Sequence, residues 1–225
     1  MSEAQVAHVH LPDGILSIEW VAVYWLIALS ILGIIILHFR RSKKALDVRV
    51  LAYAGAATAL AFVVFQAEVP ILGGVHLNFT PMLGILAGPV IGSVSALIIN
   101  ILSSSLGHGG WGPIGLNFLI NIVEIAIGFA VFAVIFRRLH VNIFASALVA
   151  TLTALTISNI LMIGALFTSG VQGAVGSEYS AVNLYLIAGV NEIVAIIESA
   201  ITAFLLSFIL KVKPELVGGV KVEKS

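Results

Sequence analysis

Long apolar segments separated by short loops make up most of this chain of 225 residues. Hydrophobic residues are 60% of the chain and charged residues only 10%, against about 25% charged residues in ordinary soluble domains. Segments of about 18 or more apolar residues are long enough to cross a bilayer as helices. The sequence therefore predicts an all-α fold, a polytopic helical bundle of about six to seven transmembrane helices in the cell membrane.

The apolar segments divide the chain into a loop, a bundle and a tail. We expect a single integral membrane domain over 1–225, with an N-terminal loop at 1–15, a helical bundle at 16–211 and a tail at 212–225. The expected helices cover 16–39, 48–66, 79–105, 114–136, 142–167 and 182–210. Gly88-Pro89 interrupts the third of these and divides it into a short and a longer piece.

The basic residues predict how the helices are oriented. All eleven Lys and Arg lie in three places: 40–49, 137–138 and the segment from Lys211 onward. The positive-inside rule assigns these places to the cytoplasm, so the N-terminus and the loops at 68–78, 107–113 and 168–181 are expected outside. Because two outer loops flank 79–105, this segment must enter the membrane and return, and we predict a hairpin at Gly88-Pro89.

Several classes of function are disfavoured by what the sequence lacks. Without cysteine the chain has no disulfides and no thiolate metal sites. The formal net charge is zero, so no bulk electrostatic attraction favours nucleic acid. A phosphate-binding G-x-x-x-x-G-K-[ST] motif and a His-Glu-x-x-His motif are both absent. We therefore expect neither an ATPase nor an enzyme.

The histidines near the N-terminus are candidate metal ligands. His8 and His10 precede Pro12-Asp13-Gly14, a turn that would hold clustered imidazoles in place. Imidazole is the commonest side-chain ligand of divalent first-row metals, although this segment also fits an ordinary polar lead-in to a membrane helix. His76 and His108 lie in loops that are expected on the same outer side.

Polar residues within the apolar segments are expected to face the interior of the bundle. Asn117, Asn121 and Glu124 are spaced at i, i+4 and i+7, so they share one face of a helix. They can support a site as outer-sphere groups, or they can serve only in hydrogen bonds between helices.

Ala52 and Ala56 form a small-residue pair at which a partner helix could dock, unless that face packs inside the bundle.

Four motifs occur in an order that resembles a known family. They are His10-Leu11-Pro12-Asp13-Gly14-Ile15-Leu16, Gly74-Val75-His76-Leu77, Leu86-Ala87-Gly88-Pro89, and Gly107-His108-Gly109-Gly110 with Gly115-Leu116-Asn117. The set resembles the substrate-binding membrane subunit of energy-coupling-factor (ECF) nickel/cobalt transporters, of the type that serves cobalamin biosynthesis. The resemblance is clear over about 10–130, and topology extends it to the remainder of the chain.

The resemblance implies a function, a metal site and partners. It implies that His10 and His76 ligate Co²⁺ or Ni²⁺ at the outer face, in a square-planar site made of nitrogen, a geometry typical of Ni(II). The metal is then a transported substrate and not a catalytic cofactor. ATP-driven uptake would depend on a transmembrane coupling protein, which could dock on Ala52 and Ala56, and on two cytoplasmic ATPases. The family allows a small accessory membrane subunit as well.

The chain departs from the family pattern at its N-terminus. In the family the equivalent of His10 directly follows the initiator methionine, whose α-amine is itself a ligand, whereas nine residues precede His10 here. His8 can replace that amine, trimming can expose the α-amine of Val9, or the site is weakened; His108 is a further candidate for the fourth donor. The alternatives for function are a vitamin-type ECF binding subunit, an intramembrane metal-dependent enzyme, and a channel.

Overall fold

The computed structural model describes residues 11, 13–41, 48–67, 76–171 and 181–212, and this part of the chain is helical apart from its short connections. The helices are α1 (Ile18–Arg41), α2 (Val48–Gln66), α3 (Thr80–Ser105), α4 (Ile114–Ala133), the π-helical turn η1 (Val134–Arg138), α5 (Ile143–Thr168) and α6 (Ala181–Val212). The predicted all-α class is confirmed, and each predicted helix is found to within two residues except the fourth, which ends early because η1 takes over its last turn.

Side chains are distributed as expected for a protein surrounded by lipid. Large apolar side chains point outward, for example Leu26, Ile34 and Phe204, which are each about two-thirds exposed. Polar side chains such as Asn121 and Glu124 are buried instead. Helices α1, α3, α5 and α6, together with α4 continued by η1, are long and apolar enough to cross a membrane, and the apolar part of α2 is shorter. The chain is therefore a multi-pass membrane protein.

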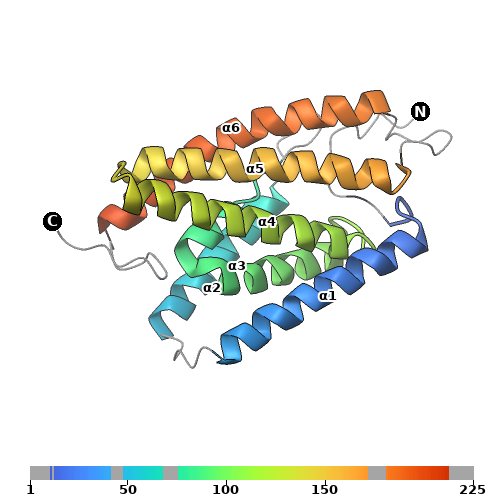
Figure 1. The fold of residues 1–225 in the computed structure, drawn as a ribbon, viewed down its shortest axis with the longest axis horizontal. Coiled ribbons are helices and arrows are strands. Elements are labelled where there is room, and N and C mark those ends of the chain that lie inside the picture. The colour runs from blue at the N-terminus through green and yellow to red at the C-terminus, as the bar shows by residue number, and fades with distance from the viewer. Residues whose placement is uncertain (1–10, 12, 42–47, 68–75, 172–180, 213–225) are drawn as a thin grey trace.

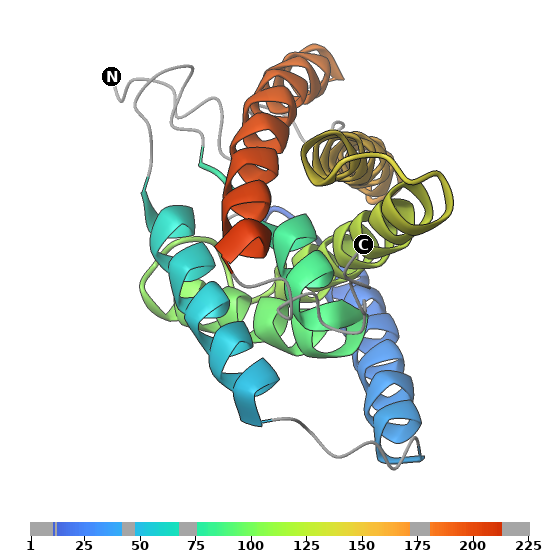
Figure 2. The ribbon, with the colours of Figure 1, turned by 90° about the vertical axis from the view of Figure 1, so that its left-hand side faces the viewer.

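Most of the helices pack against the helix that is next to them in sequence, and α1 is the exception. Helix α3 lies between α2 and α4, α5 packs against both α4 and α6, and α1 lies along α4 (Figure 1 and Figure 2). Of the five helices that are long and apolar enough to cross a membrane, α3 is the most buried and α1 the least. Helix α1 is thus peripheral, whereas α3 and α4 form the centre of the bundle.

The basic side chains of the described helices gather at one end of the bundle. They lie in the last turn of α1, in η1 and in the last turn of α6, which all point toward the left of Figure 1. The first residues of α1 and α4 and the end of α5 lie at the opposite end. This segregation is the one that the positive-inside rule requires, and the direction of the bundle in the membrane stays a prediction.

Helix α3 contains the reversal that was predicted at Gly88-Pro89. Gly88 has φ 79° and ψ 165°, a conformation open only to glycine, and it separates two helical pieces. A Cβ atom built on Gly92 would lie 3.3 Å from the backbone nitrogen of Gly84. Residues eight apart in a straight helix are separated by about 12 Å, so the chain turns back on itself here. The two pieces of α3 form a hairpin.

Two hydrophobic clusters hold the bundle together. The first joins α2, α3, α4, α5 and α6 near the basic end and includes Phe79, Ile85, Phe132 and Leu206. The second lies toward the opposite end and joins α1 and the segment before it to α4, α5 and α6. Phe65 of the first cluster and Ile120 and Met162 of the second also line a polar cavity, so this cavity lies between the two clusters.

Candidate functional site

The segment that precedes α1 is fastened to the loop between α3 and α4. The backbone N–H of Gly110 donates to the carbonyl oxygen of Leu11 (3.0 Å), and the N–H of Gly112 donates to Oδ1 of Asp13 (2.7 Å). A Cβ atom on Gly110 would lie only 2.5 Å from the backbone nitrogen of Asp13, so residue 110 must be glycine for this approach. We call these two hydrogen bonds the clasp.

Leu11 brings the N-terminal segment into the bundle interior. Its side chain is 1% exposed and belongs to the cluster that includes Leu116, Ile120 and Met162, and the last two also line the cavity. At Leu11 the segment that precedes α1 therefore lies next to the residues that line the cavity. The predicted ligands His8 and His10 lie outside the described residues.

His76 and His108 lie together against Phe65. The ring centroids of His76 and His108 are 5.4 Å apart, and the Phe65 ring is 4.9 Å from His76 and 5.6 Å from His108. Nδ1 of His76 and Nε2 of His108 are both buried. These histidines come from the segment before α3 and from the loop after it, so the reversal in α3 brings together two residues that are 32 apart in sequence.

A carboxylate on α6 anchors the segment that carries His76. The backbone N–H groups of Asn78 and Phe79 donate to the two oxygens of Glu198, at 2.8 Å and 2.9 Å. Phe79 has a positive φ of 54°, an uncommon conformation that this two-point anchor helps to hold. Helical spacing within α6 does not indicate that Glu198 pairs with Asn78, which lies 120 residues earlier in the chain. The available signal was an intramembrane carboxylate with no basic residue nearby, which requires other donors.

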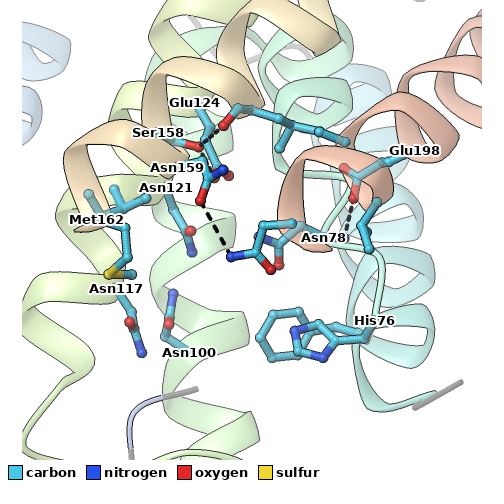
Figure 3. Close-up of a pocket in the computed structure, with 16 residues that line it drawn as sticks. His76, Asn78, Asn100, Asn117, Asn121, Glu124, Ser158, Asn159, Met162 and Glu198 are labelled. Carbon is cyan, nitrogen blue, oxygen red and sulfur yellow. Dashed lines mark hydrogen bonds between the residues drawn. The ribbon is translucent and has the colours of Figure 1, made fainter. Parts of the chain in front are cut away.

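The cavity beside His76 measures about 110 Å³ and is lined mostly by polar side chains. Its lining residues are Phe65, His76, Asn78, Asn100, Asn117, Ile120, Asn121, Glu124, Leu155, Ser158, Asn159, Met162, Asn191, Val194, Ala195 and Glu198. Figure 3 shows the labelled side chains converging from α3, α4, α5, α6 and the segment before α3. The sequence-predicted residues His76, Asn117, Asn121 and Glu124 are thus brought to one cavity, whereas His108 lies beside His76 and outside the lining.

Glu124 lies at the deepest of the three predicted positions on α4. Its carboxylate accepts a hydrogen bond from Ser158 Oγ on α5 (2.7 Å) and another from Thr80 Oγ1 on α3. Glu124 thereby links three helices. Within the described part of the chain, no three His, Cys, Asp or Glu side chains are arranged to hold a metal ion.

Ala52 and Ala56 lie on the outer surface of α2. Both are exposed, and so is Gly55 between them, where an added Cβ would meet nothing within 4 Å. The buried small residues of this helix are Ala54 and Ala61 instead. The face of α2 that carries Ala52 and Ala56 therefore does not pack inside the bundle in this structure.

The comparisons with known proteins agree with this architecture. Residues 10–216 match the family model of CbiM, the cobalt uptake substrate-specific transmembrane region. The chain is 29% identical to a Haloquadratum walsbyi protein named for metal transport, over 92% of this chain and 93% of that protein. It is 26% identical to the cobalt transport protein CbiM of Clostridium tetani, over 94% of this chain and 90% of that protein.

A relative named for nickel and a solved structure extend the comparison. The match to a fused nickel transport protein of Archaeoglobus fulgidus is 24% identical and covers 92% of this chain and 68% of that protein. The crystal structure of a transition metal transporter has the same fold, with a TM-score of 0.76 at 20% identity, over 91% of this chain and 93% of that one. The chain belongs to the CbiM family, the substrate-specific membrane components of cobalt uptake.

Proposed function

We propose that this protein captures Co²⁺ or Ni²⁺ at the outer face of the membrane, through His76 and the N-terminal segment, for uptake driven by partner subunits. The observation that carries this proposal is that His76 lines the cavity, while Leu11, which the clasp holds, is buried in the same cluster as Ile120 and Met162 of the cavity lining. Relatives named for cobalt and for nickel transport support the choice of cargo. Both metals accept imidazole nitrogen, so the donor set alone does not separate them.

His10 is the proposed second ligand beside His76. His10 directly precedes Leu11, which is buried in the same cluster as Ile120 and Met162 of the cavity lining, and consecutive Cα atoms are only about 3.8 Å apart. It can offer its imidazole and its backbone amide, and His76 offers a third nitrogen. The fourth donor is His8 in the full-length chain, or the α-amine of Val9 if the chain is trimmed, with His108 as the remaining candidate because its ring lies beside that of His76.

Energy for uptake must come from other proteins in this proposal. By family resemblance these are a transmembrane coupling protein and two cytoplasmic ATPases, with a small accessory membrane subunit as a further component. The exposed pair Ala52 and Ala56 is the proposed docking face for the coupling protein, since small residues let a second helix approach closely. The basic ends of α1 and α6 would then face the cytoplasm.

The size of the cavity favours a metal ion over a vitamin. A volume of about 110 Å³ is well below the range of about 300–1,000 Å³ that is typical of pockets for larger organic ligands. A vitamin-type binding subunit is therefore the weaker candidate.

Titration calorimetry of the purified full-length chain with Co²⁺ and with Ni²⁺ tests this function. His76→Ala and His10→Ala should each abolish high-affinity binding, because each removes one or more nitrogen donors. His38→Ala is the matched control, since His38 is exposed in the last turn of α1 at the basic end. High-affinity binding that persists in both the His76 and the His10 variant would refute the assignment.

A further inference from the structure

The start of α3 is bound by another helix and not by a capping side chain of its own. Phe79, which precedes α3, makes no side-chain capping hydrogen bond, whereas helices commonly begin after a Ser, Thr, Asp or Asn that does. The backbone N–H groups of Asn78 and Phe79 instead donate to Oε2 and Oε1 of Glu198, at 2.8 Å and 2.9 Å. Because two successive N–H groups are bound by both oxygens of one carboxyl group, the contact fixes the direction of the chain as well as its position.

This contact lies in a closely packed part of the bundle. Glu198 is 2% exposed and Phe79 is 3% exposed, and the Phe79 side chain packs in the first hydrophobic cluster. The next residue, Thr80, donates its hydroxyl to Glu124 of α4. Residues 78–80 are therefore bound by side chains of α6 and α4. A carboxyl group in the interior of a membrane protein is costly, and such residues are commonly functional.

His76 lies two residues before Asn78 on the same segment (Figure 3). Residues 76–79 belong to no helix or strand. A chain advances by at most about 3.6 Å per residue, so the Cα atom of His76 lies within about 7 Å of that of Asn78. The His76 ring also contacts Phe65 of α2, at 4.9 Å between centroids. A change at the Glu198 anchor therefore displaces His76 relative to α2 and to the cavity.

We propose that Glu198 is a positioning residue for the outer metal site, and that it sets the place of the His76 imidazole through the backbone of Asn78 and Phe79. This inference rests on the proposed function, in which His76 is a ligand. The role needs no bond between Glu198 and the metal. Groups that orient a metal ligand typically change metal affinity by about 10–100-fold when they are removed. Binding at the outer face would then depend on α6, although every proposed ligand lies within the first 108 residues.

Replacing Glu198 with glutamine disturbs the anchor with little change in shape. Glutamine offers one acceptor oxygen and an NH₂ group, and this NH₂ group would meet one of the two backbone N–H donors. The two-point contact is then lost, and His76 is free to shift. Glu192→Gln is the matched control, because it makes the same substitution on the same helix. The Glu192 carboxyl group accepts hydrogen bonds from Thr156 and Asn159 of α5 instead.

Titration calorimetry with Co²⁺ and the visible absorption spectrum of the bound Co²⁺ test the proposal in the full-length chain. Glu198→Gln should lower the affinity about tenfold or more and change the spectrum, because the spectrum reports the geometry of the ligands. Glu192→Gln should change neither. Glu198→Asp keeps two acceptor oxygens on a side chain that is one methylene shorter, so it should shift both readouts by less. A purely structural role would reduce the folded fraction and leave the spectrum of the bound metal unchanged.

The same affinity and spectrum in Glu198→Gln and Glu192→Gln would overturn the positioning role. A melting curve shows whether each variant folds. If Glu198→Gln does not fold, Glu198→Asp decides, and wild-type affinity and spectrum in that variant would overturn the proposal. His76→Ala separates this result from a failure of the proposed function. High-affinity binding that persists in His76→Ala would refute His76 as a ligand and the inference with it, whereas its loss there, with no change in Glu198→Gln, would refute the positioning role alone.

Discussion

Replacing Gly110 with alanine should open the clasp between the N-terminal segment and the loop before α4. The new Cβ atom would lie 2.5 Å from the backbone nitrogen of Asp13 and 2.6 Å from its Oδ1, distances that no real contact tolerates. Asp13 must move, and its movement breaks the hydrogen bond from Gly112 N (2.7 Å) and strains the one from Gly110 N to Leu11 (3.0 Å). The perturbation is local, because all of these groups lie at one end of the bundle.

The two hydrogen bonds set the size of the expected effect. A neutral backbone hydrogen bond contributes about 1 kcal/mol and one to a carboxylate about 1.5–3 kcal/mol. Because Asp13 is exposed, its hydrogen bond with Gly112 is expected to contribute an amount near the lower end of the carboxylate range. The loss of one bond and the strain in the other should then weaken the clasp by about 2 kcal/mol in total. If the clasped form is the one that binds metal, the apparent affinity for Co²⁺ or Ni²⁺ falls by about 30-fold.

Titration calorimetry of the full-length Gly110→Ala protein measures this change, and a melting curve reports whether the bundle remains folded. Gly33→Ala is the matched control, because a Cβ atom on Gly33 of α1 meets nothing within 4 Å. Asp13→Ala should give a smaller loss, of about tenfold, since it removes only the acceptor for Gly112. Wild-type metal affinity in both the Gly110 and the Asp13 variant would refute the role of the clasp.

Two further variants test the fold and the partner surface. Gly88→Ala should lower the free energy of unfolding by about 1–3 kcal/mol, because alanine is strained at φ 79° and ψ 165°, and an unchanged melting temperature would contradict the need for glycine in this hairpin. Ala56→Leu should leave Co²⁺ binding by the isolated chain intact, since residue 56 is exposed, and should reduce co-purification with the coupling protein. Full recovery of the complex with the Leu variant would exclude this face of α2 as the docking surface.

Much of the fold follows from short-range information. Apolar runs of bilayer length predict the helices, and the placement of Lys and Arg predicts which of their ends lie together. The hairpin in α3 could also be predicted, because two loops on the same side must flank it and Gly88-Pro89 breaks the helix between them. These inferences succeed because membrane thickness and charge placement act on each segment separately.

The candidate site was only partly predictable. The face of α4 that carries Asn117, Asn121 and Glu124 follows from helical spacing, and the structure directs it into the cavity. The pairing of Glu198 with Asn78 and Phe79 joins residues that are about 120 positions apart, and helical periodicity contains no information on which residues two distant segments bring together.

The sequence by itself determined the membrane class, the helix boundaries, the turn at Gly88 and the polar face of α4, because each depends on the local pattern of one segment. Only the tertiary structure decided that Asp13 accepts from Gly112, 99 residues away, that the rings of His76 and His108 meet, and that Ala56 faces outward. These contacts depend on how helices rotate about their axes and pack against each other. Side chains from several segments together determine this rotation and packing, so no single stretch of sequence specifies them.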